Sequence, residues 1–147
     1  MDKVIKNFQN ISYGPAPEDS KEVTNWIKNL KNPNNHFING KFVKSSSSKK
    51  LNIINPSTNK KIATLSVASK KDVNVAVSAA KKAHVKWSKL SSFDRSKYLY
   101  ALARLIQKNS RFISVLETID NGKPIRETRD IDIPLVARHF YYHAGWA

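Results

Sequence analysis

The chain has 147 residues, of which 40% are apolar and 25% are charged, so it carries enough core-forming material for one domain. No stretch approaches the ~18 consecutive apolar residues of a membrane span, and the first residues lack the apolar run of a signal peptide, so a cytoplasmic location is expected. The absence of cysteine excludes a disulfide framework, a thiolate metal site and a cysteine nucleophile within these residues.

The formal net charge of +15 comes almost entirely from lysine. Because a basic surface attracts phosphate backbones and anionic membranes, the charge raises the hypothesis of a nucleic-acid-binding module. The lysines are spread along the whole chain, however, and arginine, which dominates base recognition, is sparse. We therefore interpret the charge as a bias of composition and expect neither nucleic acid nor membrane as a partner.

Residues 1–36 form a polar lead-in with one helical signal. Helix-start residues occupy positions 17–20, and an apolar stripe follows at the helical spacing i, i+3, i+4, i+7. The stripe consists of Val23, Trp26, Ile27 and Leu30. A cluster of Pro33 with neighbouring asparagines then ends the predicted helix.

Two stretches of strand character come next. In residues 37–43, Asn39-Gly40 supplies the positive φ angles of a type I′ turn between two short apolar arms, which predicts a β-hairpin. After a loop rich in serine and lysine, strands are predicted at residues 51–55 and 62–67, with a turn at 56–59 between them.

From Ser69 the apolar period changes from two to nearly four, which predicts helices. Ser69 with Asp72 resembles a capping box, and Ser91 with Asp94 repeats the pattern before a second helix. The first helix, of about five turns, is expected to align one set of side chains on one face. This set consists of Val73, Ala76, Val77, Ala80, His84 and Trp87. The buried face of the second helix is expected to comprise Leu99, Leu102, Ala103 and Ile106.

Ser110 is expected to cap a third helix, and Gly122 has the position of a left-handed C-terminal turn that Pro124 prevents from continuing. The inward side chains of this helix are expected to be Phe112, Ile113, Leu116 and Ile119. A last helix is predicted to begin at Asp130 or Ile131, with Pro134 in its first turn. Its wide aromatic face has no partner in the sequence that follows, so a large exposed aromatic patch is predicted. That face consists of Leu135, Val136, His139, Phe140, Tyr142 and His143.

Few side chains invite a chemical role. His139 and His143 have the i, i+4 spacing of a ligand pair, but without a glutamate between them we interpret them as packed or surface residues and expect no zinc site. Asn121 and Lys123 could be polar residues of an active site. The run Asp-Asn-Gly-Lys-Pro at 120–124 is nevertheless explained by a helix-terminating turn, so we assign neither residue to catalysis.

Five motifs in order resemble the N-terminal region of the aldehyde dehydrogenase superfamily. They are the hairpin 37–43, Asn-Pro-Ser-Thr at 55–58, Trp87-Ser88 after an alanine-rich helix, Asp-Asn-Gly-Lys-Pro at 120–124 and Ala-Gly-Trp-Ala at 144–147. Asn59 stands where the family more often has glycine, which a left-handed turn position tolerates. The resemblance covers about residues 36–147, and residues 13–20 with Trp26 are also similar to the lead-in of family-sixteen aldehyde dehydrogenases.

The resemblance implies an α/β fold in which an N-terminal β-hairpin and strands precede a cluster of helices. Residues 37–147 would be the leading part of an aldehyde dehydrogenase NAD(P)-binding domain, truncated before its Rossmann-type strands. The implied activity is NAD- or NADP-dependent oxidation of an aldehyde to a carboxylic acid through a cysteine thiohemiacetal, in a homo-oligomer.

In family members the catalytic asparagine, glutamate and cysteine and the phosphate-binding turn come after the position of Ala147, so no catalytic or cofactor-binding residue is assigned and this chain alone is expected to be inactive. One ligand role carries over, since Asp132-Ile133-Pro134 matches a segment associated with a structural monovalent cation. A carboxylate favoured by the helix dipole explains Asp132 equally well.

Three hypotheses remain open, in this order. The first is an incomplete aldehyde dehydrogenase chain. The second is a short interaction or regulatory protein that docks through its C-terminal aromatic helix. The third is the basic nucleic-acid-binding module.

Overall fold

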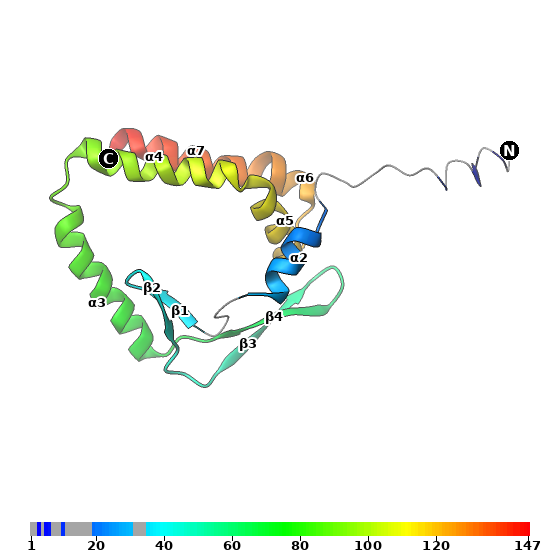
Figure 1. Cartoon of the computed structure of the whole chain (residues 1–147), viewed down its shortest axis with the longest axis horizontal. Coiled ribbons are helices and arrows are strands. Elements are labelled where there is room, and N and C mark those ends of the chain that lie inside the picture. The colour runs from blue at the N-terminus through cyan, green and yellow to red at the C-terminus, as the bar shows by residue number, and fades with distance from the viewer. Residues whose placement is uncertain (1–2, 4, 7–9, 11–18, 31–34) are drawn as a thin grey trace.

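The structure, a computed structural model, describes residues 3, 5, 6, 10, 19–30 and 35–147. In chain order its elements are helix α2 (Lys21–Lys28), strands β1 (Asn35–Ile38), β2 (Lys41–Lys44), β3 (Lys50–Asn55) and β4 (Lys60–Ser66), helices α3 (Lys70–Trp87), α4 (Ser92–Lys108), α5 (Ser110–Asn121) and α6 (Ile125–Glu127), the π-helical segment η1 (Thr128–Asp132) and helix α7 (Ile133–Trp146). They trace an open ring, with α4 and α7 along one side and the two hairpins on the opposite side (Figure 1). The expected order of hairpin, strands and helices is confirmed.

The lead-in helix forms at the predicted apolar stripe but ends at Lys28, so Leu30 of the stripe lies after it. Helix α2 follows Asp19, whose carboxylate accepts a hydrogen bond from the Lys21 amide at 2.7 Å. Val23 is buried, and the Trp26 ring meets the Phe112 ring of α5 edge-on at 5.4 Å. Of the motif at 13–20, residues 13–18 lie outside the described residues. The Pro33 cluster lies outside them up to position 34.

Both hairpins form in the expected places. Strands β1 and β2 pair antiparallel with Phe37 opposite Phe42, and the intervening Asn39 and Gly40 have φ of 53° and 76°. These angles confirm the predicted turn, although β1 begins two residues before the expected arm. Strands β3 and β4 form a second antiparallel pair, and Asn59 takes the left-handed conformation with φ of 54°. In the described part of the chain the two hairpins remain separate sheets.

Helix α3 confirms the capping prediction and leaves its apolar face exposed. The Ser69 hydroxyl accepts a hydrogen bond from the Asp72 amide, and the Asp72 carboxylate accepts one from the Ser69 amide. Val73, Val77 and Trp87 from the predicted face are 51%, 46% and 37% exposed. The period of the sequence places these side chains together on one helix face, but burial requires a second element against that face.

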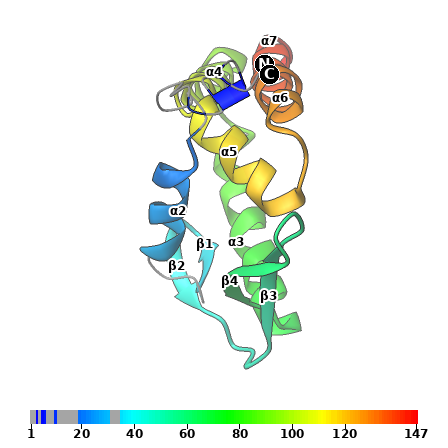
Figure 2. The ribbon, with the colours of Figure 1, turned by 90° about the vertical axis from the view of Figure 1, so that its right-hand side faces the viewer.

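Helices α4 and α7 form the most extensive helix pair. They run antiparallel and lie side by side in two perpendicular views (Figures 1 and 2). Ala103 of α4 is 0% exposed and Ala137 of α7 is 2% exposed. Leu102, expected on the buried face, is 39% exposed, so that prediction is wrong. Small alanine side chains let the two helix backbones approach closely, which directs larger neighbours to the edges of the interface.

Helix α5 differs from the prediction at its start. Asn109 is its N-cap and Ser110 is its first helical residue, so Ser110 is not the cap. Asn109 also ends α4, where its side-chain amide donates to the Leu105 carbonyl at 2.8 Å. One residue therefore joins the two helices and leaves no room for a separate cap at 110. The fully buried side chains are Ser114 and Val115, while the expected inward residues are only half-buried.

The last helical stretch begins at Ile125, earlier than the expected Asp130 or Ile131. Pro124, the residue before this helix, has an extended backbone with φ of −56° and ψ of 137°. Its carbonyl accepts a hydrogen bond from the Glu127 amide at 2.9 Å. Proline suits this position because its missing N–H has no partner at a helix start. The wider turn of η1 then precedes Pro134, which likewise lacks a donor and lies in the first turn of α7.

The core of the described residues is small. Six hydrophobic side chains are buried: Val23, Ile38, Ala103, Val115, Ile133 and Ala137. Many more large hydrophobic side chains are exposed, on α3, on both hairpins and on α7. Because burial of apolar surface is the main stabilising contribution to a fold, most of the apolar surface of this chain remains available to a covering element.

None of the described helices is both long enough and apolar enough to cross a bilayer.

Candidate functional site

The run Asp-Asn-Gly-Lys-Pro forms the helix-terminating turn that the sequence predicts. Gly122 ends α5 in the left-handed conformation with φ of 77°, and its amide donates to the Thr118 carbonyl at 3.0 Å. The Asn121 side-chain oxygen accepts from the Lys123 amide at 2.7 Å. The Gly122 amide, the Lys123 amide and the Asn121 side-chain oxygen therefore serve the turn itself, as expected from a C-terminal cap.

The turn at 120–124 meets the turn that joins β3 to β4. A Cβ atom on Gly122 would lie 2.6 Å from Pro56 Cγ, closer than side chains approach one another. Asn55 shapes the β3–β4 turn, since its side-chain oxygen accepts from the amides of Ser57 and Thr58 at 2.9 and 3.3 Å. Two motifs that lie more than sixty positions apart in the chain are thus adjacent in space, a contact that requires glycine at position 122.

Lys123 reaches across the connection to η1. Its ammonium donates to the carboxylate of Asp132, with side-chain exposures of 42% and 21%. This hydrogen bond raises the pKa of Lys123 above its ordinary value. Lys123 is therefore more than a turn residue, since it connects the end of α5 to the start of α7.

Asp132, the predicted cation ligand, uses its carboxylate for this ion pair. Among the described residues, no group of three or more histidine, cysteine, aspartate or glutamate side chains is placed to hold a metal ion. The Lys123 ammonium is a monovalent cation in its own right and neutralises the carboxylate where it stands. Cation binding at Asp132 stays a prediction.

A buried hydroxyl cluster, which the sequence analysis missed, fixes η1 against α5. Thr128 is 0% exposed and Ser114 is 1% exposed. The Thr128 hydroxyl lies 3.2 Å from the Ser114 carbonyl and 3.0 Å from the Thr118 hydroxyl. Buried hydroxyls need such partners, since an unpaired one costs stability. The available signal was the pair of small polar residues, Ser114 and Thr118, one turn apart on the inward face of α5.

A second polar cluster surrounds the start of α3. The Asp72 carboxylate accepts hydrogen bonds from the amides of Ser69 and Ser46 and from the Ser45 hydroxyl, at 2.8 to 3.1 Å. The hydrogen bonds from Ser69 and Ser46, that from the Ser69 amide first, hold the pKa of Asp72 well below its usual range. His36 of β1 brings its Nε2 to 3.8 Å from the same carboxylate. The cluster therefore joins the β1–β2 hairpin and the following loop to α3.

The described residues do not fit a dinucleotide. Such a site needs a glycine-rich turn from a strand into a helix, whose free amides receive the phosphates. Within residues 35–147 the junction of β4 with α3 has this topology, but it contains no glycine, and its Ser69 amide already donates to the Asp72 carboxylate. The described glycines lie in the two tight turns and inside α7.

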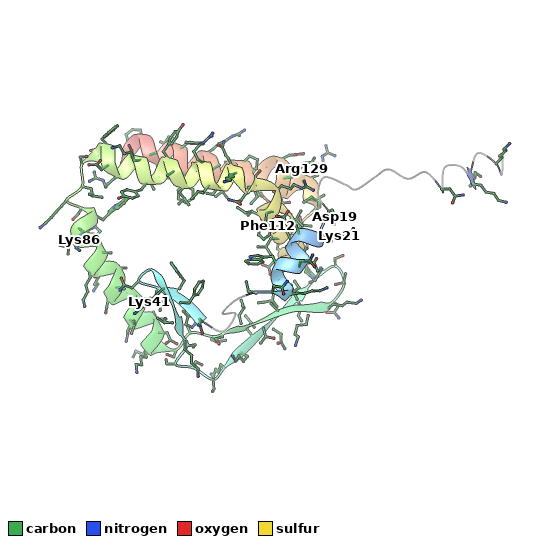
Figure 3. All side chains as sticks on the ribbon, viewed as in Figure 1. Asp19, Lys21, Lys41, Lys86, Phe112 and Arg129 are labelled. Atoms are coloured by element: carbon green, nitrogen blue, oxygen red, sulfur yellow. The ribbon has the colours of Figure 1, made fainter. Side chains whose placement is uncertain are left out.

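Two surfaces are prominent among the described residues. A groove of about 920 Å³ between the β1–β2 hairpin and α3 is lined by five lysines and no acidic residue. These are Lys41, Lys70, Lys71, Lys82 and Lys86, of which Lys41 and Lys86 are marked in Figure 3. On α7, Tyr142 of the predicted aromatic face is 61% exposed, which confirms the predicted exposure at this residue, and Trp146, outside that face, is 76% exposed. His139 and His143 are also exposed, as expected for surface residues.

An apolar cleft of about 610 Å³ lies where five elements converge. Its lining comes from α2, β3, β4, α5 and α7, and Figure 3 marks Phe112 at the contact of α2 with α5. Aliphatic side chains make up most of the wall, and the acidic residues Glu117 and Asp120 are its charged members. Its volume falls within the range of ligand and peptide sites.

Comparisons with known proteins agree on one family. The sequence model of the aldehyde dehydrogenase family matches residues 42–147. An aldehyde dehydrogenase of Alternaria alternata is 40% identical over 116 residues, which are 78% of this chain and 23% of that protein. Mitochondrial aldehyde dehydrogenase family 2 member B4 of Arabidopsis thaliana is 42% identical over 113 residues, 76% of this chain and 21% of its own length.

Solved structures give the same result. HpcC from Thermus thermophilus superposes with a TM-score of 0.80 at 29% identity, covering 92% of this chain and 27% of that one. PnpE, solved in complex with nicotinamide adenine dinucleotide, superposes with a TM-score of 0.73 at 34% identity, covering 77% and 23%. The chain thus spans about a quarter of the length of the relatives that it matches.

Proposed function

The chain belongs to the aldehyde dehydrogenase family, and from this premise we propose that it serves as the N-terminal portion of an NAD(P)-dependent aldehyde dehydrogenase. The observation that carries the proposal is the match over residues 42–147, which includes the β3–β4 hairpin and all helices from α3 onward. The contact of Gly122 with Pro56 supports it, because it joins two of the family motifs in one structural unit.

The proposed role of these residues is that of a scaffold. The chain contains no cysteine and therefore no cysteine nucleophile, and its strand-to-helix junction does not suit a dinucleotide. We therefore place the nucleophile and the binding of NAD or NADP in the part of an aldehyde dehydrogenase that lies outside these 147 residues. Oxidation of an aldehyde to an acid is then an activity of the whole polypeptide, and these residues alone are inactive.

We propose four further properties from the resemblance to this family. They are assembly into a homo-oligomer, a cytoplasmic location, a lead-in at residues 1–36 before a partial domain at 37–147, and a monovalent cation at Asp132. The last would require displacement of the Lys123 ammonium from the Asp132 carboxylate.

A complementation assay tests the main proposal. The chain is expressed alone, and together with the Alternaria alternata enzyme from which the matched segment has been deleted. With a panel of aliphatic and aromatic aldehydes and either NAD or NADP, we expect no reduced cofactor from either piece alone. Together the two pieces should copurify and reduce cofactor.

In the matched control, the catalytic cysteine of the Alternaria alternata enzyme that lacks the matched segment is replaced by serine. The two pieces should still form a complex but should not reduce the cofactor, because the thiolate is the nucleophile. Turnover by the 147-residue chain alone would contradict the proposal. Failure of the two pieces to associate would contradict it as well.

One observation favours the second hypothesis, an interaction protein that docks through its C-terminal helix. Tyr142 and Trp146 expose large aromatic surfaces on α7, and aromatic residues are enriched at protein interfaces. This hypothesis predicts that the chain is monodisperse in solution and captures a full-length dehydrogenase through α7. Aggregation of the isolated chain, relieved by Trp146→Ser, would count against it.

The lysine-lined groove is the observation in favour of a nucleic-acid-binding module. Such a module would bind oligonucleotides with an affinity that falls steeply with salt concentration. We propose instead that nucleic acid is not a partner, so fluorescently labelled single-stranded and duplex oligonucleotides should show no specific binding at low salt. Tight binding that Lys82→Ala and Lys86→Ala weaken would reverse this conclusion.

A further inference from the structure

The lysine-lined groove between the β1–β2 hairpin and α3 concentrates charge of one sign. Five lysines line its volume of about 920 Å³, and the described residues of its wall include no aspartate or glutamate. Figure 3 marks two of these lysines, Lys41 on β2 and Lys86 near the end of α3. A concave surface with charge of one sign concentrates ligands of the opposite charge. The groove therefore suits an anionic ligand.

The five lysines have no anionic partner among the described residues. Elsewhere in the chain a lysine can pair with a nearby carboxylate, as Lys123 does with Asp132. None of the ion pairs in the described part of the chain involves a lysine of the groove. Asp72, the one acidic residue in the sequence of α3, accepts from Ser69 and Ser46 instead. The positive charge of the groove is therefore not neutralised within the described structure.

The placement of these lysines on α3 also costs the helix stability. Lys70 and Lys71 lie in its first turn, where the partial positive charge of a helix N-terminus disfavours cations. Lys82 and Lys86 have the spacing i, i+4, at which like charges repel. Folding of the helix gives no reason for either arrangement, whereas a bound anionic segment would offset both.

The groove is long and partly apolar, which favours an extended polypeptide over a compact anion. From Lys70 to Lys86 the helix advances about 24 Å, a distance that an extended segment of about seven residues spans. Successive side chains of such a segment point in opposite directions, so acidic residues can face the lysines while alternate aliphatic residues face an apolar wall. That wall consists of Ile38, Val43, Val75, Ala79 and Ala83.

The groove lacks the side chains that recognise nucleic acid. Unpaired bases are bound by stacking on aromatic rings, and guanine is read by bidentate arginine. The described lining of the groove includes neither an aromatic residue nor an arginine. A polypeptide with carboxylates therefore fits the groove better than a strand of nucleic acid does.

We propose that this groove binds an acidic, extended segment of a partner protein, in which aspartate or glutamate alternates with aliphatic residues. The carboxylates pair with the lysines of the groove, and the aliphatic side chains cover its apolar wall, where Val75 is 50% exposed. The proposal goes beyond the dehydrogenase activity and does not depend on it, because no residue of the groove is assigned to that reaction.

The experiment uses the 147-residue chain and a fluorescently labelled peptide of about ten residues, in which glutamate alternates with leucine. Binding is followed by fluorescence anisotropy at low and at physiological salt concentration. One comparison peptide carries glutamine in place of glutamate, and another carries serine in place of leucine. Labelled single-stranded and duplex DNA are titrated under the same conditions.

We expect the peptide of glutamate and leucine to bind, and each comparison peptide to bind about tenfold more weakly, because one lacks the charges and the other lacks the apolar side chains. Lys82→Gln combined with Lys86→Gln should weaken binding about tenfold and reduce its dependence on salt, because charge pairs are lost. Lys41→Gln, on the hairpin, is an independent variant and should weaken binding about threefold. In the matched control, Lys81→Gln with Lys89→Gln removes the same charge from positions outside the groove and should change binding less than about twofold.

Three results would overturn the proposal. One is that the peptide does not bind. Another is that the matched control weakens binding as much as the groove variant, which would make the overall charge responsible. The third is tighter binding of DNA than of the peptide through Lys82 and Lys86, which would make nucleic acid the occupant. Circular dichroism should show the groove variant folded like the parent chain, because both lysines are exposed and repel each other.

Discussion

Helices α4 and α7 pack along one another, whereas α3 contacts mainly strand β1 and leaves its apolar stripe exposed. Ala103 and Ala137 are almost completely buried between α4 and α7, while Val73 and Val77 of α3 are about half exposed. All three helices carry apolar positions at helical spacing. The difference shows that such a pattern defines the face to be covered, and that burial depends on whether a partner element is present.

The largest expected effect tests the packed side of this comparison. Ala103→Leu inserts a larger side chain into the α4–α7 interface and should lower the free energy of unfolding by about 2–3 kcal/mol, because a well-packed interface has no room for it. Urea unfolding followed by circular dichroism measures the loss. The matched control, Ala83→Leu on exposed α3, should change stability by less than about 0.5 kcal/mol. Equal losses at both positions would contradict the comparison.

The next effect concerns the contact between two family motifs. Gly122→Ala combines left-handed strain with a clash against Pro56 and should cost about 2 kcal/mol. Gly40→Ala has a similar φ of 76° but no atom within 4 Å of the new Cβ, so it should cost about 1 kcal/mol. Adding Pro56→Ala to Gly122→Ala should recover the difference in a thermal unfolding series. No recovery would show that the clash is unimportant.

Asp72→Asn should have a smaller effect than Gly122→Ala, and the native Asp72 carboxylate is expected to make stability on the α3 side pH-dependent. The carboxylate accepts several hydrogen bonds that lower its pKa in the folded state. Its contribution to stability is therefore complete above the pKa of an unfolded aspartate, ~3.9, and is lost as the pH falls through the lower folded pKa. Unfolding of the parent chain should become easier below about pH 4, and that dependence should be flatter in Asp72→Asn. Identical acid profiles would contradict this role.

The smallest effect is expected at the ion pair between Lys123 and Asp132. Lys123→Met removes the ammonium and should reduce stability slightly, because the pair is partly solvent-exposed. The folded pKa of Lys123 is raised, so its contribution is complete below the pKa of an unfolded lysine, ~10.4, and is lost as the pH rises through the folded value. Melting temperatures at low and high salt measure this contribution. A loss as large as that of Gly122→Ala would show that Lys123 has a further structural role.

Local chemistry was predicted most reliably. Asn39-Gly40, Asn59, Gly122 and the Ser69–Asp72 capping box all adopt the expected conformations. Each of these depends on interactions within a few residues, namely the φ preference of one residue or a hydrogen bond between neighbours. The prediction of the cap at Ser110 was wrong because Asn109 ends one helix and begins the next, which depends on how closely the two helices follow one another.

Interactions between distant positions were not predictable from the pattern. The Thr128 hydroxyl cluster and the pairing of Lys123 with Asp132 depend on the placement of η1 beside α5. The exposure of Leu102 depends on the closeness with which Ala103 and Ala137 bring two helices together. The period of a sequence predicts which residues share one face of a helix or strand, but it does not predict which other element packs against that face.

The sequence by itself determined the order of hairpins and helices, the tight turns and the family, because each depends on residue types at fixed spacing. The tertiary structure decided which apolar faces are buried, placed Gly122 against Pro56 and paired Lys123 with Asp132. It also left Glu117 Oε2 buried without a donor from the described residues. The physical reason is that burial and hydrogen-bond satisfaction are properties of pairs of surfaces, and a single amphipathic segment specifies only one of the two.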